Sequence, residues 1–393
     1  MDACAVDVNN GGRPAALPVR LEELLALCVA RDASDMHLAP GEAPMLREDG
    51  LLAVVDRWPP LPATELGDWV ARLLAPGQNR ILAERGDCDG AVTVNGTRFR
   101  YNVFRRSNGV CVAFRRLGEE FRDLRELGLP ETLYQLCDLP NGLVLVAGPT
   151  GAGKSTTLAA LLDRINRSHP CHIITIEDPI EYVHTPVRGM VSQRQVGTDC
   201  SGFYEALVAA LREDPDVILV GEIRDLDTIR TAITAAETGH LVFTTVHAGD
   251  CAGVIERLVS VFPSGEQDGI RRQLSFVLRA VITQQLLICD GPHATGRNGG
   301  DKRRSRVVAS EVLMVNGAVA NLVATAKSSQ IYSAMEVGGA QGMQTLEQDL
   351  ARLHLAGYIS EATALAFARS PRNLRDRVNH LRAGSHSAPM SHP

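Results

Sequence analysis

The chain has 393 residues, of which 40 are basic and 46 are acidic, so its formal net charge at pH 7 is −6. An acidic balance argues against a protein whose main task is to neutralise a nucleic-acid backbone. The length exceeds what one hydrophobic core usually holds, and no run approaches the roughly 18 apolar residues that a membrane span needs.

Two observations predict a cytoplasmic protein. The chain begins with Met1-Asp2 and lacks the apolar stretch of a secretory signal. Its nine cysteines are scattered and include no C-x-x-C pair. This usage is typical of reduced thiols in an intracellular protein and indicates that the chain holds no zinc site.

The first part of the chain predicts a tail and a small mixed domain. Residues 1–18 are expected to form the tail, and residues 19–127 an α+β domain. Apolar residues in this domain recur with helical spacing over 21–30 and 66–74, and alternate as in strands over 91–94 and 99–104.

Residues 148–155 fit the phosphate-binding pattern G-x-x-x-x-G-K-[ST], and Thr156 follows it. Only three of the 40 basic residues are lysines, and Lys154 is one of them. A compact ammonium fits between phosphate oxygens where a guanidinium is too wide. The glycines let backbone N–H groups point at the phosphates, and the Ser155 hydroxyl suits Mg²⁺. The expected nucleotide-binding residues are Gly148, Pro149, Thr150, Gly151, Ala152, Gly153, Lys154, Ser155 and Thr156.

Four continuous apolar runs predict a parallel sheet covered on both faces. They span residues 143–147, 172–176, 217–220 and 241–246. Ligands of such sheets bind at the carboxyl ends of the strands, so polar residues just past those ends are candidates to meet the phosphate held by Lys154. These candidates are Glu177, Asp178, Glu181, Glu222 and His247.

The nucleotide-binding core is expected to extend over residues 130–306 and to end in a loop, from residue 289, that is rich in Gly and Arg. A mainly helical region is expected over 307–382. The composition of residues 383–393 predicts a disordered tail.

Four separated motifs resemble the secretion-type ATPases of bacterial type IV pili and type II secretion. They occupy residues 34–38, 176–184, 211–225 and 236–240, and the last three resemble the Asp box, Walker B region and His box of that family. The resemblance implies an α/β fold: a RecA-like P-loop NTPase core, a smaller α+β, PAS-like amino-terminal domain and a helical carboxyl-terminal region. It also implies ATP and Mg²⁺ as cofactors.

Within this family the chain looks most like the pilus retraction ATPases. Its amino-terminal domain is short, no paired C-x-x-C motif follows the His box, and residues 335–350 resemble the retraction branch. One segment departs from that branch. Where retraction ATPases carry A-I-R-N-L-I-R-E, residues 318–325 read A-V-A-N-L-V-A-T, so Ala320 and Ala324 replace both arginines.

Strand positions and the resemblance together predict roles. Glu222 follows an apolar strand and is best placed to polarise the attacking water. Glu181 is expected to hold Mg²⁺ together with Ser155, and a structural role is its alternative. His247 and His240 are candidates to sense the γ-phosphate, the alternative being ordinary polar residues at strand ends.

Two arginines of the first domain, Arg100 and Arg115, stand on alternating strand patterns where the family carries arginines. Ring-shaped motors often bring positive charge to the transferring phosphoryl group from a neighbouring subunit. The resemblance therefore implies that these two side chains act in trans. Arg98, Arg105, Arg106 and Arg116 are expected to be surface charges, although a shift of one residue in register would exchange some of these assignments.

These features predict a hexameric, ATP-hydrolysing motor that powers type IV pilus retraction at the cytoplasmic face of the inner membrane. Its expected partner is the inner-membrane platform protein of the pilus. The alternatives are a pilus assembly or secretion ATPase and an accessory retraction paralogue. The acidic charge disfavours a nucleic-acid motor. A subunit that binds ATP without turnover is disfavoured because Lys154, Ser155 and Glu222 are all present.

Overall fold

The chain divides into two compact units in the computed structural model, which describes residues 17–48, 51–117, 121–292 and 306–385. The first unit contains the residues up to 120 together with Pro179–Val183. The second contains Phe121–Asp178 and the chain from His184 onward. Most of the two expected tails, and much of the expected loop, lie outside the described residues. Within the described residues, every helix is too short or too polar to serve as a membrane span.

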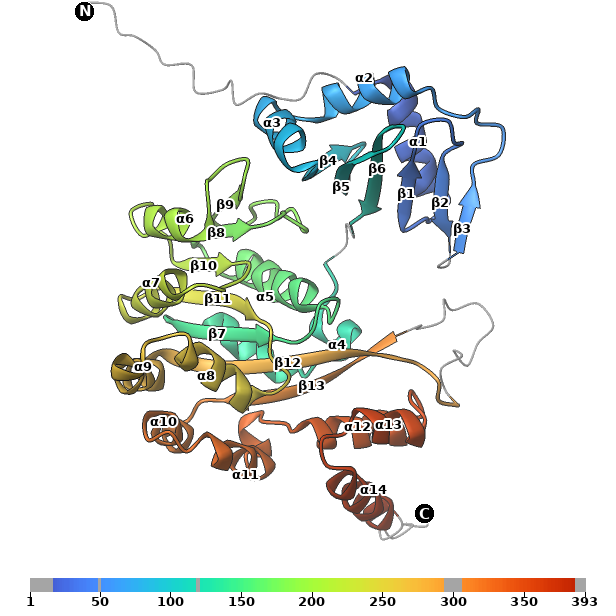
Figure 1. The fold of residues 1–393 in the computed structure, drawn as a ribbon. Helices are drawn as coiled ribbons and strands as arrows, with labels where there is room; N and C mark the ends of the chain where they lie inside the picture. The colour runs from blue at the N-terminus through green and yellow to red at the C-terminus, as the bar shows by residue number, and fades with distance from the viewer. Residues whose placement is uncertain (1–16, 49–50, 118–120, 293–305, 386–393) are drawn as a thin grey trace, which may run out of the picture. The chain divides into compact units, whose positions relative to one another are not determined.

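The first unit is built on an antiparallel sheet of six strands, in the order β3-β2-β1-β6-β5-β4 (Figure 1). Phe99, Tyr101 and Val103 of β5 are buried in a core that includes leucines of α1 and α2, while the residues between them face outward. This alternation follows from the two-residue period of a strand, and it confirms the pattern expected over 99–104. The elements are α1 (Val19–Ala30), β1 (Asp35–Leu38), β2 (Met45–Glu48), β3 (Leu51–Val54), α2 (Ala63–Leu73), α3 (Pro76–Arg85), β4 (Asp87–Val94), β5 (Thr97–Arg106) and β6 (Gly109–Arg116).

The second unit contains a seven-stranded sheet in the order β13-β12-β7-β11-β10-β8-β9. Its strands run parallel except for β13, which pairs antiparallel with β12. The four expected apolar runs form neighbouring strands, which confirms the parallel α/β core. The strands are β7 (Gly142–Ala147), β8 (His172–Glu177), β9 (Met190–Gln195), β10 (Val217–Val220), β11 (Leu241–Val246), β12 (Leu278–Ile288) and β13 (Arg306–Met314).

One boundary of the expected helical region is wrong. Its first residues form β13, which pairs with β12 along the whole length from Ile288↔Arg306 to Ala280↔Met314. The run from Val307 to Leu313 is buried throughout. It therefore lacks the periodic alternation of apolar and polar positions that would distinguish a strand from a helix. The pairing with β12 decides in favour of a strand.

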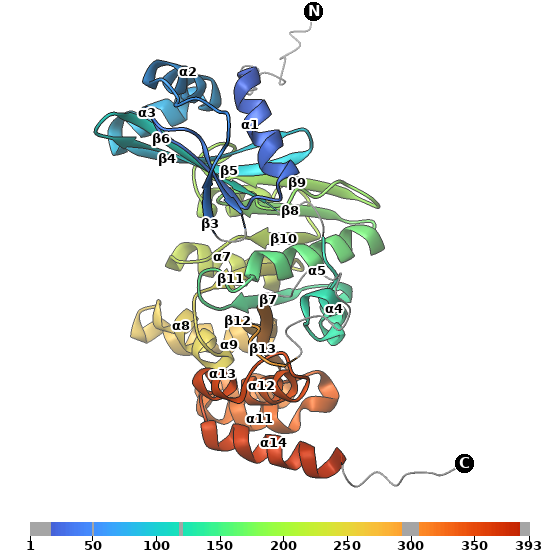
Figure 2. The same cartoon turned by 90° about the vertical axis from the view of Figure 1, so that its right-hand side faces the viewer.

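Helices cover both faces of the large sheet because alternate strand residues point to opposite sides. Leu143 and Leu145 of β7 join one core with α6, α7, α8 and α9, whereas Val144 and Val146 join the other with α4, η1 and α5. Figure 2 shows α4 and α5 on one side of the strands and α7 and α8 on the other. The helices are α4 (Leu124–Leu127), η1 (Glu131–Asp138), α5 (Lys154–Ser168), α6 (Phe203–Ala210), α7 (Leu226–Glu237), α8 (Cys251–Ser260) and α9 (Ser264–Val277).

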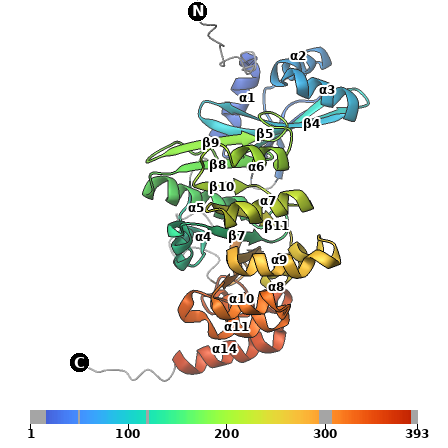
Figure 3. The same cartoon turned by 90° about the vertical axis from the view of Figure 1, so that its left-hand side faces the viewer.

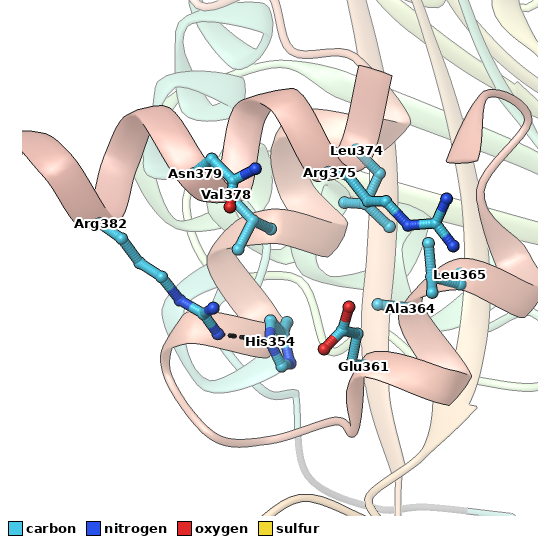
Figure 4. A pocket seen from close by; sticks show the side chains of 9 residues that line it. All are labelled: His354, Glu361, Ala364, Leu365, Leu374, Arg375, Val378, Asn379 and Arg382. Carbon is cyan, nitrogen blue, oxygen red and sulfur yellow. Dashed lines mark hydrogen bonds between the residues drawn. The ribbon is translucent and has the colours of Figure 1, made fainter. Parts of the chain in front are cut away.

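The carboxyl-terminal helices group at one end of this unit (Figures 1 and 3). Leu350, Leu353 and Leu374 share a core with Leu287 of β12 and Val307 of β13, so the helices rest on the sheet. A cavity of about 230 Å³ opens between α12, α13 and α14, and none of its lining residues is a predicted site residue (Figure 4). The helices are α10 (Gly317–Ala324), α11 (Ile331–Val337), α12 (Leu346–Leu355), α13 (Glu361–Phe367) and α14 (Pro371–Ser385).

Candidate nucleotide-binding site

The P-loop joins the carboxyl end of β7 to the amino end of α5 and requires glycine at three positions. Gly148, Gly151 and Gly153 adopt φ values of 147°, 78° and 88°, in the region that residues with a Cβ rarely occupy. A Cβ on Gly148 would lie 2.3 Å from the carbonyl oxygen of Gln284. The loop is thus shaped by close backbone approach, and it leads into the amino end of a helix, where anions bind favourably.

Lys154 and Ser155 open helix α5. The Lys154 ammonium donates to the carbonyl oxygens of Gly148, at 3.1 Å, and Pro149, at 3.0 Å, so the side chain folds back over the loop. Ser155 is half-buried in the first helical turn. A glycine cradle that leaves no room for a Cβ at Gly148, with an ammonium and a hydroxyl at its rim, has the donor set that fits a magnesium nucleotide.

Gln284 supports the P-loop from β12 and was not among the predicted residues. It is 1% exposed, its amide nitrogen donates to the Ala152 carbonyl at 2.7 Å, and its amide oxygen accepts from the Thr157 hydroxyl at 2.9 Å. The sequence signal that could have identified it is a glutamine pair, Gln284-Gln285, which follows Thr283 between the apolar residues 280–282 and 286–288. A buried amide needs partners, and here the partners are the P-loop and α5.

Glu222 and His247 follow adjacent parallel strands, β10 and β11, and meet at the same edge of the sheet. The His247 Nε2 atom lies 3.9 Å from Glu222 Oε2, and the same oxygen forms an ion pair with the Arg224 guanidinium at 2.8 Å. Backbone geometry fixes the two ends: the Ile223 N–H donates to the Thr245 carbonyl and the Thr245 hydroxyl donates to the Gly221 carbonyl. The predicted convergence of the strand ends is therefore present for this pair.

The electrostatics of His247 tie it to Lys154. Burial lowers the pKa of His247, the nearby Lys154 ammonium lowers it further, and Glu222 opposes them. The net direction is downward, so the imidazole is neutral at pH 7. A neutral ring offers one nitrogen as a donor and the other as an acceptor beside Glu222.

His240 and Glu177 occupy other positions. His240 precedes β11, and its ring nitrogen Nδ1 lies 2.9 Å from the Ala235 carbonyl oxygen at the end of α7. It is therefore one strand length from His247, at the edge of the sheet opposite the P-loop, and the structure does not bring it to that loop. The Glu177 carboxylate accepts from Thr175 at 2.6 Å and from Gln193 at 3.2 Å.

Arg100, Arg115 and Glu181 belong to the first unit. Arg100 and Arg115 are direct cross-strand partners in the β5–β6 register, and their side chains are 41% and 69% exposed. Like charges that face each other across strands are destabilising. Asp89 lies 3.5 Å from Arg100 and Asp35 lies 2.8 Å from Arg115, so each guanidinium has an acidic partner beside it.

Asp35 is itself held in its charged form. Burial alone would raise the pKa of Asp35, but hydrogen bonds from Ser34 and Arg115 outweigh burial, and the pKa lies below its usual value. Asp35 faces Arg115 in the β1–β6 register. The carboxylate therefore orients one guanidinium while Arg115 remains largely exposed.

Comparison with known proteins gives one family. A model described as Type II/IV secretion system protein matches residues 15–361. The chain is 44% identical, over 90% of its length and 99% of the relative, to a protein of Pseudomonas aeruginosa described as type IV pilus retractation ATPase PilT. It is 36% identical, over 91% of each chain, to type IV pilus ATPase PilU of the same species. The crystal structure of the pilus retraction motor PilT with bound ADP matches with a TM-score of 0.82 and 41% identity, covering 91% of this chain and 99% of that one.

Proposed function

Because this chain belongs to the Type II/IV secretion system protein family, we propose that it is an ATP-hydrolysing motor that retracts a type IV pilus. The observation that carries the proposal is the 44% identity to a pilus retraction ATPase over 99% of that relative. The P-loop geometry also supports the proposal, because the glycine cradle and Lys154 suit a nucleoside triphosphate.

The proposed chemistry divides among a few side chains. The P-loop N–H groups and the Lys154 ammonium would bind the phosphates, and the Ser155 hydroxyl would hold Mg²⁺, which would supply positive charge to the phosphoryl oxygens. The role of Glu181 as a further Mg²⁺ ligand stays a prediction from the sequence. Glu222 orients and polarises the attacking water, and Arg224 fixes the Glu222 carboxylate through their 2.8 Å ion pair. His247 Nε2 lies 3.9 Å from the Glu222 oxygen Oε2, and His247 senses the terminal phosphate.

The two arginines of the first unit fit a role in a neighbouring subunit's site. Arg100 and Arg115 lie side by side, exposed, on an antiparallel sheet whose strand pairing fixes their spacing. Such a pair presents positive charge to a phosphate that develops negative charge during transfer. We therefore extend the proposal to a homohexameric ring that works on the cytoplasmic platform protein of a pilus at the inner membrane.

The choice of retraction rests on similarity to a relative whose name states retraction. Identity is higher to the retraction ATPase, 44%, than to the PilU relative, 36%. The two alanines that replace arginines lie one turn apart on α10, at Ala320 and Ala324, and both are half-buried. Residues 318–324 thus belong to the short helix α10, which Thr325 caps, and the altered charge of the segment is a difference within the same fold.

Cells provide the test of retraction. A cell that lacks this chain should carry many surface pili that fail to shorten, and it should lose twitching motility. Wild-type chain supplied from a plasmid should restore twitching, whereas the Lys154→Ala variant should not. A cell without pili would instead make the chain an assembly motor, and normal twitching would make it an accessory subunit.

A further inference from the structure

Arg369 links the loop that carries His247 to the carboxyl-terminal helices. It lies between α13 and α14, and its guanidinium donates to the Gly249 carbonyl at 3.1 Å and pairs with the Glu311 carboxylate on β13. Gly249 is two residues past His247, in the connection from β11 to α8. One side chain therefore contacts a helical connector, a core strand and the His247 loop.

Each end of that loop has a fixed point of its own. His247 directly follows β11, and at the other end Asp250 caps α8 by accepting from the Gly253 N–H at 2.6 Å. Between them the Gly249 carbonyl accepts from Arg369. The middle of the loop thus takes its position from the α13–α14 connector.

The connector is anchored by two buried carboxylates. Glu311 and Glu347 are each 2% exposed. Glu347 accepts from the Ser370 N–H at 3.0 Å and from the Tyr332 hydroxyl at 3.0 Å. Burial raises the pKa of Glu311 and the Arg369 guanidinium opposes that rise. A buried carboxylate retains its charge only where it is paired, so Arg369 is held firmly at this place.

We infer that Arg369 is a positioning residue for ATP hydrolysis. Its side chain holds the His247 loop in place beside Glu222 and couples that loop to helices α12–α14. The inference rests on the proposed function, because it assumes that His247 takes part in the nucleotide cycle. Movement of His247 with the state of the terminal phosphate would reach the helices through Gly249 and Arg369. Movement of the helices would in turn shift His247 relative to Glu222, since the coupling is reciprocal.

The test must remove the link without leaving a buried charge. Glu311→Gln serves as the reference, and Arg369→Gln is added to it. In the double variant kcat should fall about tenfold or more, while KM for ATP stays within about threefold, because ground-state binding at the P-loop is intact. Arg372→Gln is the matched control, since Arg372 lies in the first turn of α14, just past the connector, and its side chain is 91% exposed.

Two further readouts separate positioning from general stabilisation. In a His247→Ala background, the Arg369 change should lower kcat by less than about twofold, because two residues that act through one contact are not additive. Hydrogen exchange of the peptide over residues 247–250 should accelerate in the double variant and not in Arg372→Gln. An equal loss of kcat with and without His247, or unchanged exchange of this loop, overturns the inference.

The same series keeps the proposed function separate. Turnover by the wild-type chain, and its loss in Lys154→Ala, test the ATPase itself. Hydrogen exchange reads the link without turnover. A protein that fails to hydrolyse ATP but shows faster loop exchange only in the double variant would therefore refute the proposed function and not the contact.

Discussion

At the scale of single residues, Lys154 and Glu222 separate nucleotide binding from hydrolysis. Lys154 folds over the P-loop, whereas Glu222 lies beyond β10 beside Arg224 and His247. Lys154→Ala should lose binding and turnover together. Glu222→Gln keeps the shape of the site but removes the charge that polarises water, so it should retain ATP while kcat falls by about 10²-fold or more.

Equilibrium binding of a fluorescent ATP analogue and steady-state phosphate release measure the two effects separately. Asp227→Asn is a suitable control, because Asp227 is an acidic residue in the first turn of α7, outside the site. Wild-type turnover by the Glu222→Gln protein would remove Glu222 from the mechanism.

His184 should make stability depend on pH. It is 7% exposed, its Nδ1 atom has no hydrogen-bond partner in the described chain, and its ring lies 4.6 Å from that of Phe121. Burial lowers the pKa of His184 from 6.5 to about 4. As pH falls from about 6.5 to 4, the unfolded chain binds a proton that the folded chain does not. The free energy of unfolding therefore decreases by up to about 3 kcal/mol over this range.

The matching experiment follows thermal unfolding between pH 7 and pH 4. His184→Phe keeps a ring against Phe121 and should flatten the decline of stability over this range. His380→Gln, at an exposed position on α14, should keep the wild-type slope. Parallel pH profiles for wild type and His184→Phe would show that this imidazole does not bind its proton differently on folding.

At the scale of elements, β12 supports the P-loop through the hydrogen bonds of Gln284. Gln284→Leu would leave the Ala152 carbonyl and the Thr157 hydroxyl without their present partner, and the loop would lose one of its fixed points. The dissociation constant for nucleotide should rise about tenfold, which corresponds to about 1.4 kcal/mol.

Nucleotide titration of Gln284→Leu and Gln285→Leu compares two adjacent glutamines on opposite faces of one strand. Gln285→Leu should bind nucleotide as the wild type does. Equal affinities for all three proteins would mean that the P-loop holds its shape without β12.

Sequence patterns anticipated some of these elements and missed others for physical reasons. The P-loop is contiguous and each of its glycines has a backbone cause, so pattern and structure agree. Strand ends located Glu222 and His247 because parallel strands bring their carboxyl ends together. Gln284 is distant in sequence from the loop it supports, and only the pairing of β12 with β7 brings them together.

His240 and His247 show how a strand separates residues that are close in sequence. His240 and His247 flank β11, and a six-residue strand spans about 20 Å at 3.3 Å per residue. Only seven positions separate them along the chain, but the strand places them at opposite ends of β11. A different limit applies to β13. A short buried run fits a strand or a helix equally well, so this strand was hidden within a region expected to be helical.

At the scale of the whole molecule, the position of Arg100 and Arg115 in a different unit from the P-loop makes assembly the central question. If these arginines complete a neighbour's site, activity should rise with protein concentration as rings form. Arg105, which is exposed on the same strand as Arg100, offers a control: Arg105→Ala should leave the concentration dependence unchanged.

Mixing two inactive variants decides between a site built within one chain and a site shared by two. In rings formed from equal amounts of Arg115→Ala and Lys154→Ala subunits, about a quarter of the interfaces pair an intact P-loop with an intact Arg115 from the neighbour. Phosphate release should therefore return to roughly that fraction of the wild-type rate if sites act independently. If Arg115 instead served the P-loop of its own chain, every site in the mixture would carry one defect and the mixture would stay as inactive as its parts.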